Sequence, residues 1–110
     1  MIPRRHINFK VMKNNGNVFV RVNGHLDGTT AYEVRSTLQR IHGTCQGKTL
    51  VLDLRAIRFF EYFGIAALSR FINNHGRQFQ EINLRGLRGP TQELFKRFGV
   101  ENFDGTDGDS

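Results

Sequence analysis

The sequence predicts a single α/β domain built on a mostly parallel sheet, and three observations support this. Segments 7–11 and 18–22 alternate apolar and polar residues on either side of a turn sequence at 14–17, which is typical of a β-hairpin. After the hairpin, each strand-like segment is joined to the next by a segment of helical periodicity, which requires parallel pairing. The chain has 110 residues, the length of one domain.

Two further strands are expected from the alternation of apolar residues. In the segment 49–55 three leucines share one face, while Val51 and Asp53 share the other, the pattern of a half-buried strand. The segment 79–85 alternates in the same way. A short edge strand over 100–103 would follow, so we expect a sheet of four to five strands.

Three helices connect and follow these strands. The first is capped by Asp27, Thr29 or Thr30, and the third begins at Gly89-Pro90 because proline is favoured in the first turn. The inner faces are formed by Ala31, Val34, Leu38 and Ile41 in the first helix and by Ile65, Leu68 and Ile72 in the second. Right-handed crossovers then place the helices mainly on one face of the sheet.

The domain is expected to span residues 7–103, between an N-terminal arm at 1–6 and a disordered acidic tail at 104–110. No segment has the apolar length of a signal peptide or a membrane span. The single cysteine excludes an internal disulfide. We therefore expect a soluble, cytoplasmic protein of the bacterial type.

The charge of the chain is strongly positive. The net charge of the chain is +6, although the last ten residues contain four acids and no Lys or Arg. The part of the chain before these residues, its body, therefore has a higher positive charge than the whole chain. Such a body attracts nucleic acid, anionic lipid or an acidic protein. We do not expect nucleic-acid binding, because the aromatic residues cluster in one loop and do not alternate with basic residues along a strand.

Signatures of an enzyme are missing from the sequence. The four histidines have no metal-ligand spacing, and no serine or cysteine lies in a nucleophile elbow. The glycine-containing loops lack the lysine that accompanies a phosphate-binding loop. We expect no catalysis, no cofactor and no metal.

Three loops that precede helices are expected to meet at one pole of the molecule. Parallel connections place the segments 24–28, 55–64 and 85–89 at the carboxyl end of the strands, where α/β sheets present their sites. The helix N-termini there offer unpaired N–H groups, and four arginines belong to the same loops: Arg55, Arg58, Arg85 and Arg88. We expect an electropositive pole; the alternative is that these arginines are solvated or pair with Glu61 and Asp53.

Four aromatic side chains occur within five residues of the second of these loops, too many to point inward together. By alternation we expect Ile57 and Phe59 in the core. Phe60 and Tyr62 are then left near the surface as anchors for a partner. For Phe63 we expect packing on the helix.

Five segments together form a combination that identifies a family. They are 22–27, 51–54, 57–68, 86–90 and 94–99, and with the residues between them they resemble the STAS domain of anti-sigma factor antagonists over most of the chain. This resemblance implies a sheet with helices on one side and a pole that docks a kinase-like anti-sigma partner.

The resemblance also implies a switch site at the start of the second helix. Phosphorylatable members carry aspartate, serine, serine or threonine, and glycine there, and phosphate on the third position breaks docking. In this chain the four positions hold Glu61, Tyr62, Phe63 and Gly64. Because phenylalanine cannot accept phosphate, we expect docking that is not switched at the usual site.

The expected function is a non-catalytic regulatory module that binds a protein, suspected to be an anti-sigma factor or kinase-like regulator. The residues expected to bind it are Asp27, Arg58, Phe60, Tyr62 and Arg88. Two other classes stay open: an accessory subunit of a membrane transporter's ATPase, and a sensor of a nucleotide or small anion at the helix N-termini. Homodimerisation through the aromatic residues is a further alternative.

Overall fold

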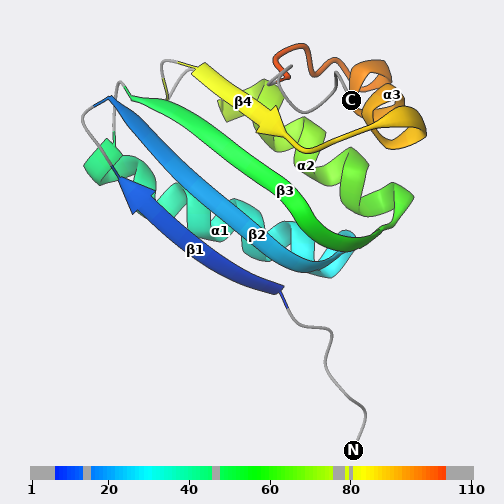
Figure 1. The fold of residues 1–110 in the computed structure, drawn as a ribbon, viewed down its shortest axis with the longest axis horizontal. Coiled ribbons are helices and arrows are strands. Elements are labelled where there is room, and N and C mark those ends of the chain that lie inside the picture. Colours follow the sequence, from blue (N-terminus) through cyan, green and yellow to red (C-terminus); the bar gives the residue numbers. More distant parts are fainter. Residues whose placement is uncertain (1–6, 14–15, 46–47, 76–78, 80, 104–110) are drawn as a thin grey trace, which may run out of the picture.

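The strands form one four-stranded sheet in the computed structural model (Figure 1). β1 (Ile7–Lys13) and β2 (Asn17–Leu26) pair antiparallel as the expected hairpin. β3 (Thr49–Phe60) pairs with β2, and β4 (Glu81–Arg85) pairs with β3, both in parallel. The prediction of a mostly parallel sheet with an N-terminal hairpin is confirmed.

The structure describes residues 7–13, 16–45, 48–75, 79 and 81–103. The arm expected at 1–6 and the tail expected at 104–110 lie outside these residues. Within the described part of the chain, no helix has both the length and the apolar character needed to cross a membrane.

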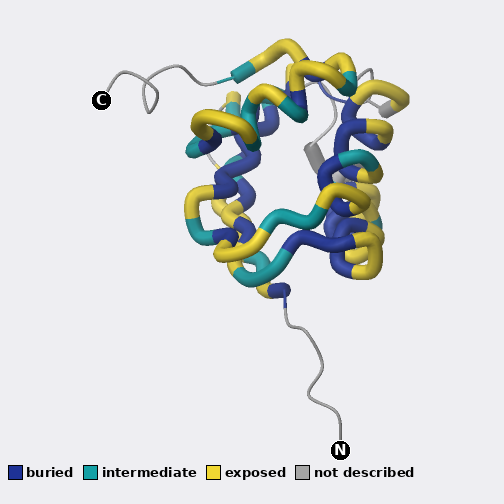
Figure 2. Tube along the Cα trace, turned by 90° about the vertical axis from the view of Figure 1, so that its right-hand side faces the viewer, coloured by how far each residue is buried: buried dark blue, intermediate teal, exposed yellow. Residues whose placement is uncertain are grey.

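The two long helices cover one face of the sheet. α1 (Gly28–Cys45) and α2 (Tyr62–His75) lie side by side behind it, and the shorter α3 (Gly89–Arg97) lies beside α2 (Figure 1). Val18, Val20 and Val22 point to the helices and are completely buried, as period-two alternation requires. Figure 2 shows the buried residues lining the space between the sheet and the helices, with exposed residues on the outside.

Two β-bulges change which residues of β3 face the core. The pairing with β2 shifts register between Arg21 and Asn23 and again between Gly24 and His25, and each shift inserts one extra β3 residue. Each extra residue reverses the alternation, so Ile57 is buried as predicted, whereas Phe59 is 48% exposed. The prediction of a buried Phe59 was therefore wrong, and so was the loop expected after Arg55, because β3 continues to Phe60.

The segment after α3 does not form the expected edge strand. Val100 N–H donates to the Phe95 carbonyl at 3.0 Å and Gly99 N–H to the Lys96 carbonyl at 2.9 Å, the two bonds that close a helix C-terminus. Gly99 has φ 92°, which glycine adopts without strain. Beyond this helix end the Asn102 carbonyl accepts from Leu84 N–H at 3.0 Å, and Phe103 forms an isolated parallel bridge with Leu84 of β4.

Candidate functional site at the carboxyl end of the sheet

The start of α1 is fixed by Asp27. Its carboxylate Oδ1 accepts hydrogen bonds from the N–H groups of Thr29 and Thr30, both at 2.9 Å, as an N-cap residue does. In return, the Thr30 hydroxyl accepts from the Asp27 N–H at 2.8 Å and donates to the His25 carbonyl at 2.6 Å. Asp27 is only 4% exposed, so the carboxylate predicted to bind a partner is committed to holding this helix.

The start of α2 packs directly on the start of α1. Glu61 N–H donates to the Leu26 carbonyl at 2.8 Å, and the Glu61 carbonyl accepts from Ile65 N–H at 3.0 Å. A Cβ atom at Gly64 would lie 2.6 Å from the Leu26 carbonyl oxygen and 2.7 Å from Asp27 Cα. Only glycine permits this approach, so the four positions 61–64 begin α2 against the end of β2.

A groove of about 580 Å³ lies between these two helix starts. We call it the acidic groove; its lining residues are Asp27, Gly28, Thr29, Thr30, Glu33, Glu61 and Phe63. Acids at helix N-termini are favoured by the helix dipoles. The prediction of an electropositive pole is wrong for this groove, because three acids and no Lys or Arg line it.

The four arginines of the three loops do not meet at one point, because Arg55 and Arg85 flank Asp53 whereas Arg58 lies nearer the end of β3. β4 ends at Arg85, opposite Asp53, whereas β3 continues to Phe60. The loop after β4 therefore packs beside Arg55, since a Cβ at Gly86 would meet its side chain. Arg58 is exposed near the end of β3, and Arg88 is exposed as the N-cap of α3.

The aromatic side chains at the start of α2 are largely exposed. Phe63 is 70% and Tyr62 is 55% exposed, because the inner face of α2 begins only at Ile65. The Tyr62 ring contacts the Phe63 ring at 5.8 Å and the Phe98 ring at 5.5 Å. We call Tyr62, Phe63 and Phe98 the aromatic ridge.

The sequence predicted the exposure of these rings correctly for only some of them. The exposure predicted for Tyr62 is confirmed, but the packing expected for Phe63 was wrong, and Phe60 is half-buried against the core. Phe98 was not identified as part of this cluster, because it lies at the C-cap of α3, far along the chain. Glu33 was also missed, although its position four residues after Thr29 on a helix places both on one face.

The aromatic ridge borders a second hollow between α2 and α3. This groove has a volume of about 680 Å³ and is lined by Phe63, Ala66, Ala67, Arg70, Asn73, Asn74 and Phe98. The Asn73 side-chain amide donates to the Phe98 carbonyl at 2.7 Å and ties α3 to α2. Small side chains beside exposed rings give a contact surface with both relief and apolar area.

The side chains of the site are charged, hydroxyl-bearing and aromatic. Among the residues that the structure describes, no group of three or more His, Cys, Asp or Glu side chains could hold a metal ion. The groups that line the acidic groove are carboxylates, threonines and one ring, all on or beside helix starts. This arrangement presents fixed negative charge next to apolar side chains.

Comparison with known proteins gives the family. The sequence model of the STAS domain matches residues 8–107, so the chain belongs to the STAS domain family. No curated protein matches the chain.

Solved structures show the same fold at low sequence identity. An anti-sigma factor antagonist from Mycobacterium paratuberculosis superposes with a TM-score of 0.62 and 24% identity, covering 80% of this chain and 73% of that one. The anti-sigma factor antagonist SpoIIAA in its unphosphorylated form gives 0.59 and 17%, covering 84% and 81%. An antisigma-factor antagonist STAS domain from Rhodobacter sphaeroides gives 0.56 and 15%, covering 74% and 85%.

Proposed function

We propose that the chain is a non-catalytic regulatory module that binds a protein partner at the carboxyl end of its sheet. The observation that carries the proposal is the exposure of Tyr62 and Phe63, at 55% and 70%, on a helix start that is fixed by close packing. Exposed rings on a rigid base lose little conformational entropy on binding and are the side chains that dominate interface energies. The STAS family and the anti-sigma factor antagonists among its structural neighbours support a regulatory binding role.

The partner surface would combine the aromatic ridge with the acidic groove. Phe63 lines both the acidic groove and the groove between α2 and α3, which makes it the centre of the surface. Arg58 and Arg88 are exposed and would contact the partner at the rim. Asp27 and Gly64 would act indirectly, by holding the two helix starts together.

Docking in this protein would be independent of phosphate at the usual position. Where phosphorylatable relatives carry a hydroxyl, Phe63 presents an apolar ring that cannot accept phosphate, and Glu61 keeps the acid that those relatives carry as aspartate at the first position of the motif. The proposal is therefore a partner interface that is constitutively competent at this position. Regulation would act on the abundance of either protein or on another site.

Affinity capture followed by titration tests the proposal. The wild-type chain is used to capture its partner from native lysate, and the purified partner is then titrated against wild type, Tyr62→Ala and Phe63→Ala. We expect at least a tenfold loss of affinity for each, corresponding to about 1.4 kcal/mol. Met12→Ala, at the far end of β1 and also exposed, is the matched control and should bind as wild type does.

Equal affinity of all four proteins for the partner would refute the assignment of the interface. Arg88→Glu tests the edge of the interface independently. We expect it to lower the affinity for the partner a few fold, and this loss should become smaller as the salt concentration is raised.

A further inference from the structure

The face of the sheet opposite α1 and α2, which we call the open face, carries a row of charges across all four strands. The pairing register places Lys10 opposite Arg21, Arg21 opposite Asp53, and Asp53 opposite Arg85. Figure 1 shows both long helices on the other side of the sheet. Strands are about 4.8 Å apart, so the row spans about 14 Å.

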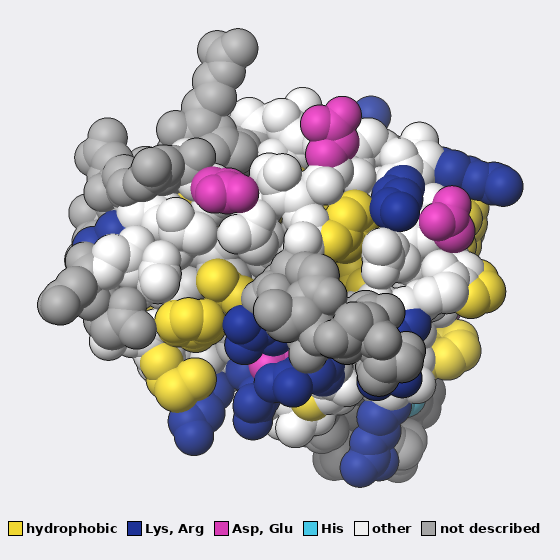
Figure 3. Space-filling model, turned by 45° about the horizontal axis from the view of Figure 1, so that its top comes forward, with side chains coloured by type: hydrophobic (Ala, Val, Ile, Leu, Met, Phe, Trp, Pro, Cys, Tyr) yellow, Lys and Arg dark blue, Asp and Glu magenta, His cyan; other side chains and the backbone are white. Residues whose placement is uncertain are grey.

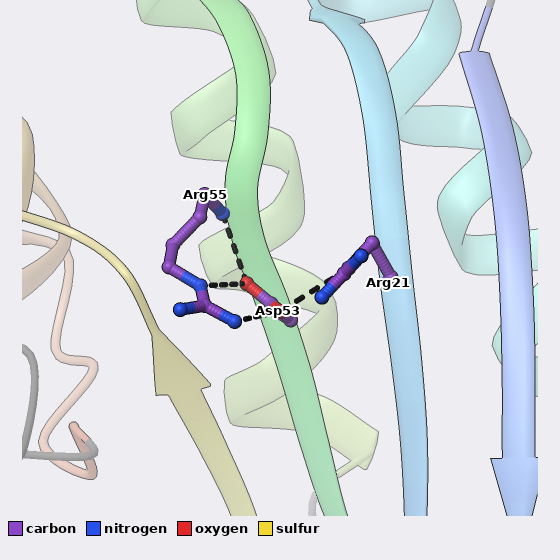
Figure 4. A network of polar contacts seen from close by, with 3 residues as sticks. All are labelled: Arg21, Asp53 and Arg55. Carbon is purple, nitrogen blue, oxygen red and sulfur yellow. Dashed lines mark hydrogen bonds and ion pairs between the residues drawn. The ribbon is translucent and has the colours of Figure 1, made fainter.

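Asp53 organises the arginines around it (Figure 4). Arg55 donates from Nε to Oδ1 at 3.1 Å and from Nη2 to Oδ2 at 3.0 Å, and its backbone N–H donates to Oδ1 at 3.1 Å. Arg21 Nε lies 3.4 Å from Oδ2. Asp53 is 6% exposed whereas both arginine side chains are about half exposed, so the carboxylate lies beneath a layer of positive charge.

Arg85 is held from the other side of β3. Its guanidinium lies 5.9 Å from the centroid of the Phe19 ring, which belongs to β2. The side chain therefore reaches across β3, over the strand that carries Asp53. In the space-filling view, Lys and Arg side chains gather around one acidic side chain (Figure 3).

We propose that the open face binds an acidic, extended segment of a partner protein. Arg21, Arg55 and Arg85 flank one buried carboxylate, and Lys10 continues the row of cations beyond Arg21. On the same face, Glu81 lies four residues from Arg85 along β4. Guanidinium groups pair with carboxylates through parallel N–H···O bonds. Because Asp53 and Phe19 already restrain three of the cations, less side-chain freedom is lost on binding.

The geometry favours a polypeptide over nucleic acid as the occupant. Surfaces that bind single strands place exposed rings among the cations, so that bases stack on them. Here the ring among the cations is Phe19, which is half-buried with the Arg85 guanidinium over it. Carboxylates two residues apart on an extended chain are about 7 Å apart, a spacing that fits cations on neighbouring and next-neighbouring strands.

The test uses the full chain and a fluorescent peptide of alternating glutamate and serine, with binding followed by anisotropy at low salt. The double variant Arg21→Gln/Arg85→Gln should raise the peptide Kd about tenfold or more. The control Arg40→Gln/Arg97→Gln removes the same charge from exposed positions on α1 and α3, and its Kd should stay within about twofold of wild type. Lys10→Gln, at an exposed edge-strand position, should weaken binding about threefold without affecting folding.

Three results would overturn the proposal. Equal losses in the open-face and control variants would mean attraction by net charge alone. Tighter binding of an oligothymidylate of equal charge, with the same sensitivity to Arg21 and Arg85, would assign the face to nucleic acid. If the wild type does not bind the peptide but the variant Asp104→Asn/Asp107→Asn/Asp109→Asn does, the open face would be assigned to the chain's own acidic segment. This inference is separate from the proposed interface at the helix starts, because Tyr62→Ala should leave peptide binding unchanged.

Discussion

The backbone N–H of Glu61 donates a 2.8 Å hydrogen bond to the carbonyl oxygen of Leu26. This bond joins the residue that precedes α2 to the last residue of β2, whose chain continues into α1 after Asp27. The two helix starts therefore form one unit, and the exposed rings of Tyr62 and Phe63 project from it. A partner that binds these rings meets a surface whose backbone is already in place.

Substitution of Gly64 by alanine should destabilise the fold. The added Cβ would lie 2.6 Å from the Leu26 carbonyl oxygen, and backbone atoms cannot rotate away as a side chain can. We expect a loss of about 1–3 kcal/mol in the free energy of unfolding, measured by urea denaturation. Gly16→Ala is the control, since a Cβ there has no atom within 4 Å and should change the free energy by about 0.5 kcal/mol or less. A Gly64→Ala chain with the wild-type midpoint would show that the two helix starts are not tightly packed.

Removal of the Asp27 cap should also lower stability, through a different mechanism. Asp27→Ala removes the acceptor for the Thr29 and Thr30 N–H groups and should cost about 1 kcal/mol. Asp27→Asn keeps an acceptor oxygen and should lose less. Urea denaturation of the three proteins side by side checks the order; an alanine variant as stable as the asparagine variant would mean that the cap bonds contribute nothing.

The sequence was sufficient for the hairpin and the parallel connections after it, and it narrowed the cap of α1 to three residues, Asp27, Thr29 and Thr30. The alternation of Val18, Val20 and Val22 can be read directly, and an aspartate followed by a glycine and two threonines signals a helix start. These features depend on neighbours along the chain. The hairpin was therefore predicted correctly, and the residue that caps α1 is one of the three candidates.

The positions of Phe59 and of the arginines could not be obtained in this way. At a β-bulge one extra residue is left unpaired. The alternation of apolar residues does not show where this happens, so the sequence did not predict correctly which β3 side chains after Arg55 face the core. The acidic groove likewise depends on how closely Gly64 lets α2 approach α1, which brings Glu33 of α1 and Glu61, the residue before α2, to the same groove. Such contacts are a property of packing between elements.

Asp53 should make stability fall in acid. Burial alone would raise the pKa of Asp53, but the hydrogen bonds from Arg55 and the charges of Arg55 and Arg21 outweigh burial and hold this pKa below its ordinary value. A carboxyl with a lowered folded-state pKa contributes stability that is fully present above its unfolded pKa, about 3.9, and is lost as the pH falls through the folded value. We expect the free energy of unfolding to decline below about pH 4 more steeply in wild type than in Asp53→Asn.

Urea titrations at several pH values between neutral and strongly acidic check this difference. Glu93→Gln is the control, because Glu93 and Lys96 form an exposed pair at 3.7 Å, and such pairs contribute little. Identical profiles for wild type and Asp53→Asn would show that the arginines do not stabilise the charged carboxylate.

The absence of a hydroxyl at Phe63 gives the sharpest test of a constitutive interface. After incubation with ATP and the kinase-like partner proposed for the chain, intact-mass and peptide analysis of wild type should show no phosphate at positions 62–64. Phe63→Ser is the matched variant: its side chain would occupy the same exposed first turn of α2, and we expect it to accept phosphate and then to lose partner affinity, because the added charge faces Glu61 and Glu33 across the acidic groove. Phosphate on Tyr62 of the wild type, accompanied by release of the partner, would contradict an interface that is independent of phosphorylation.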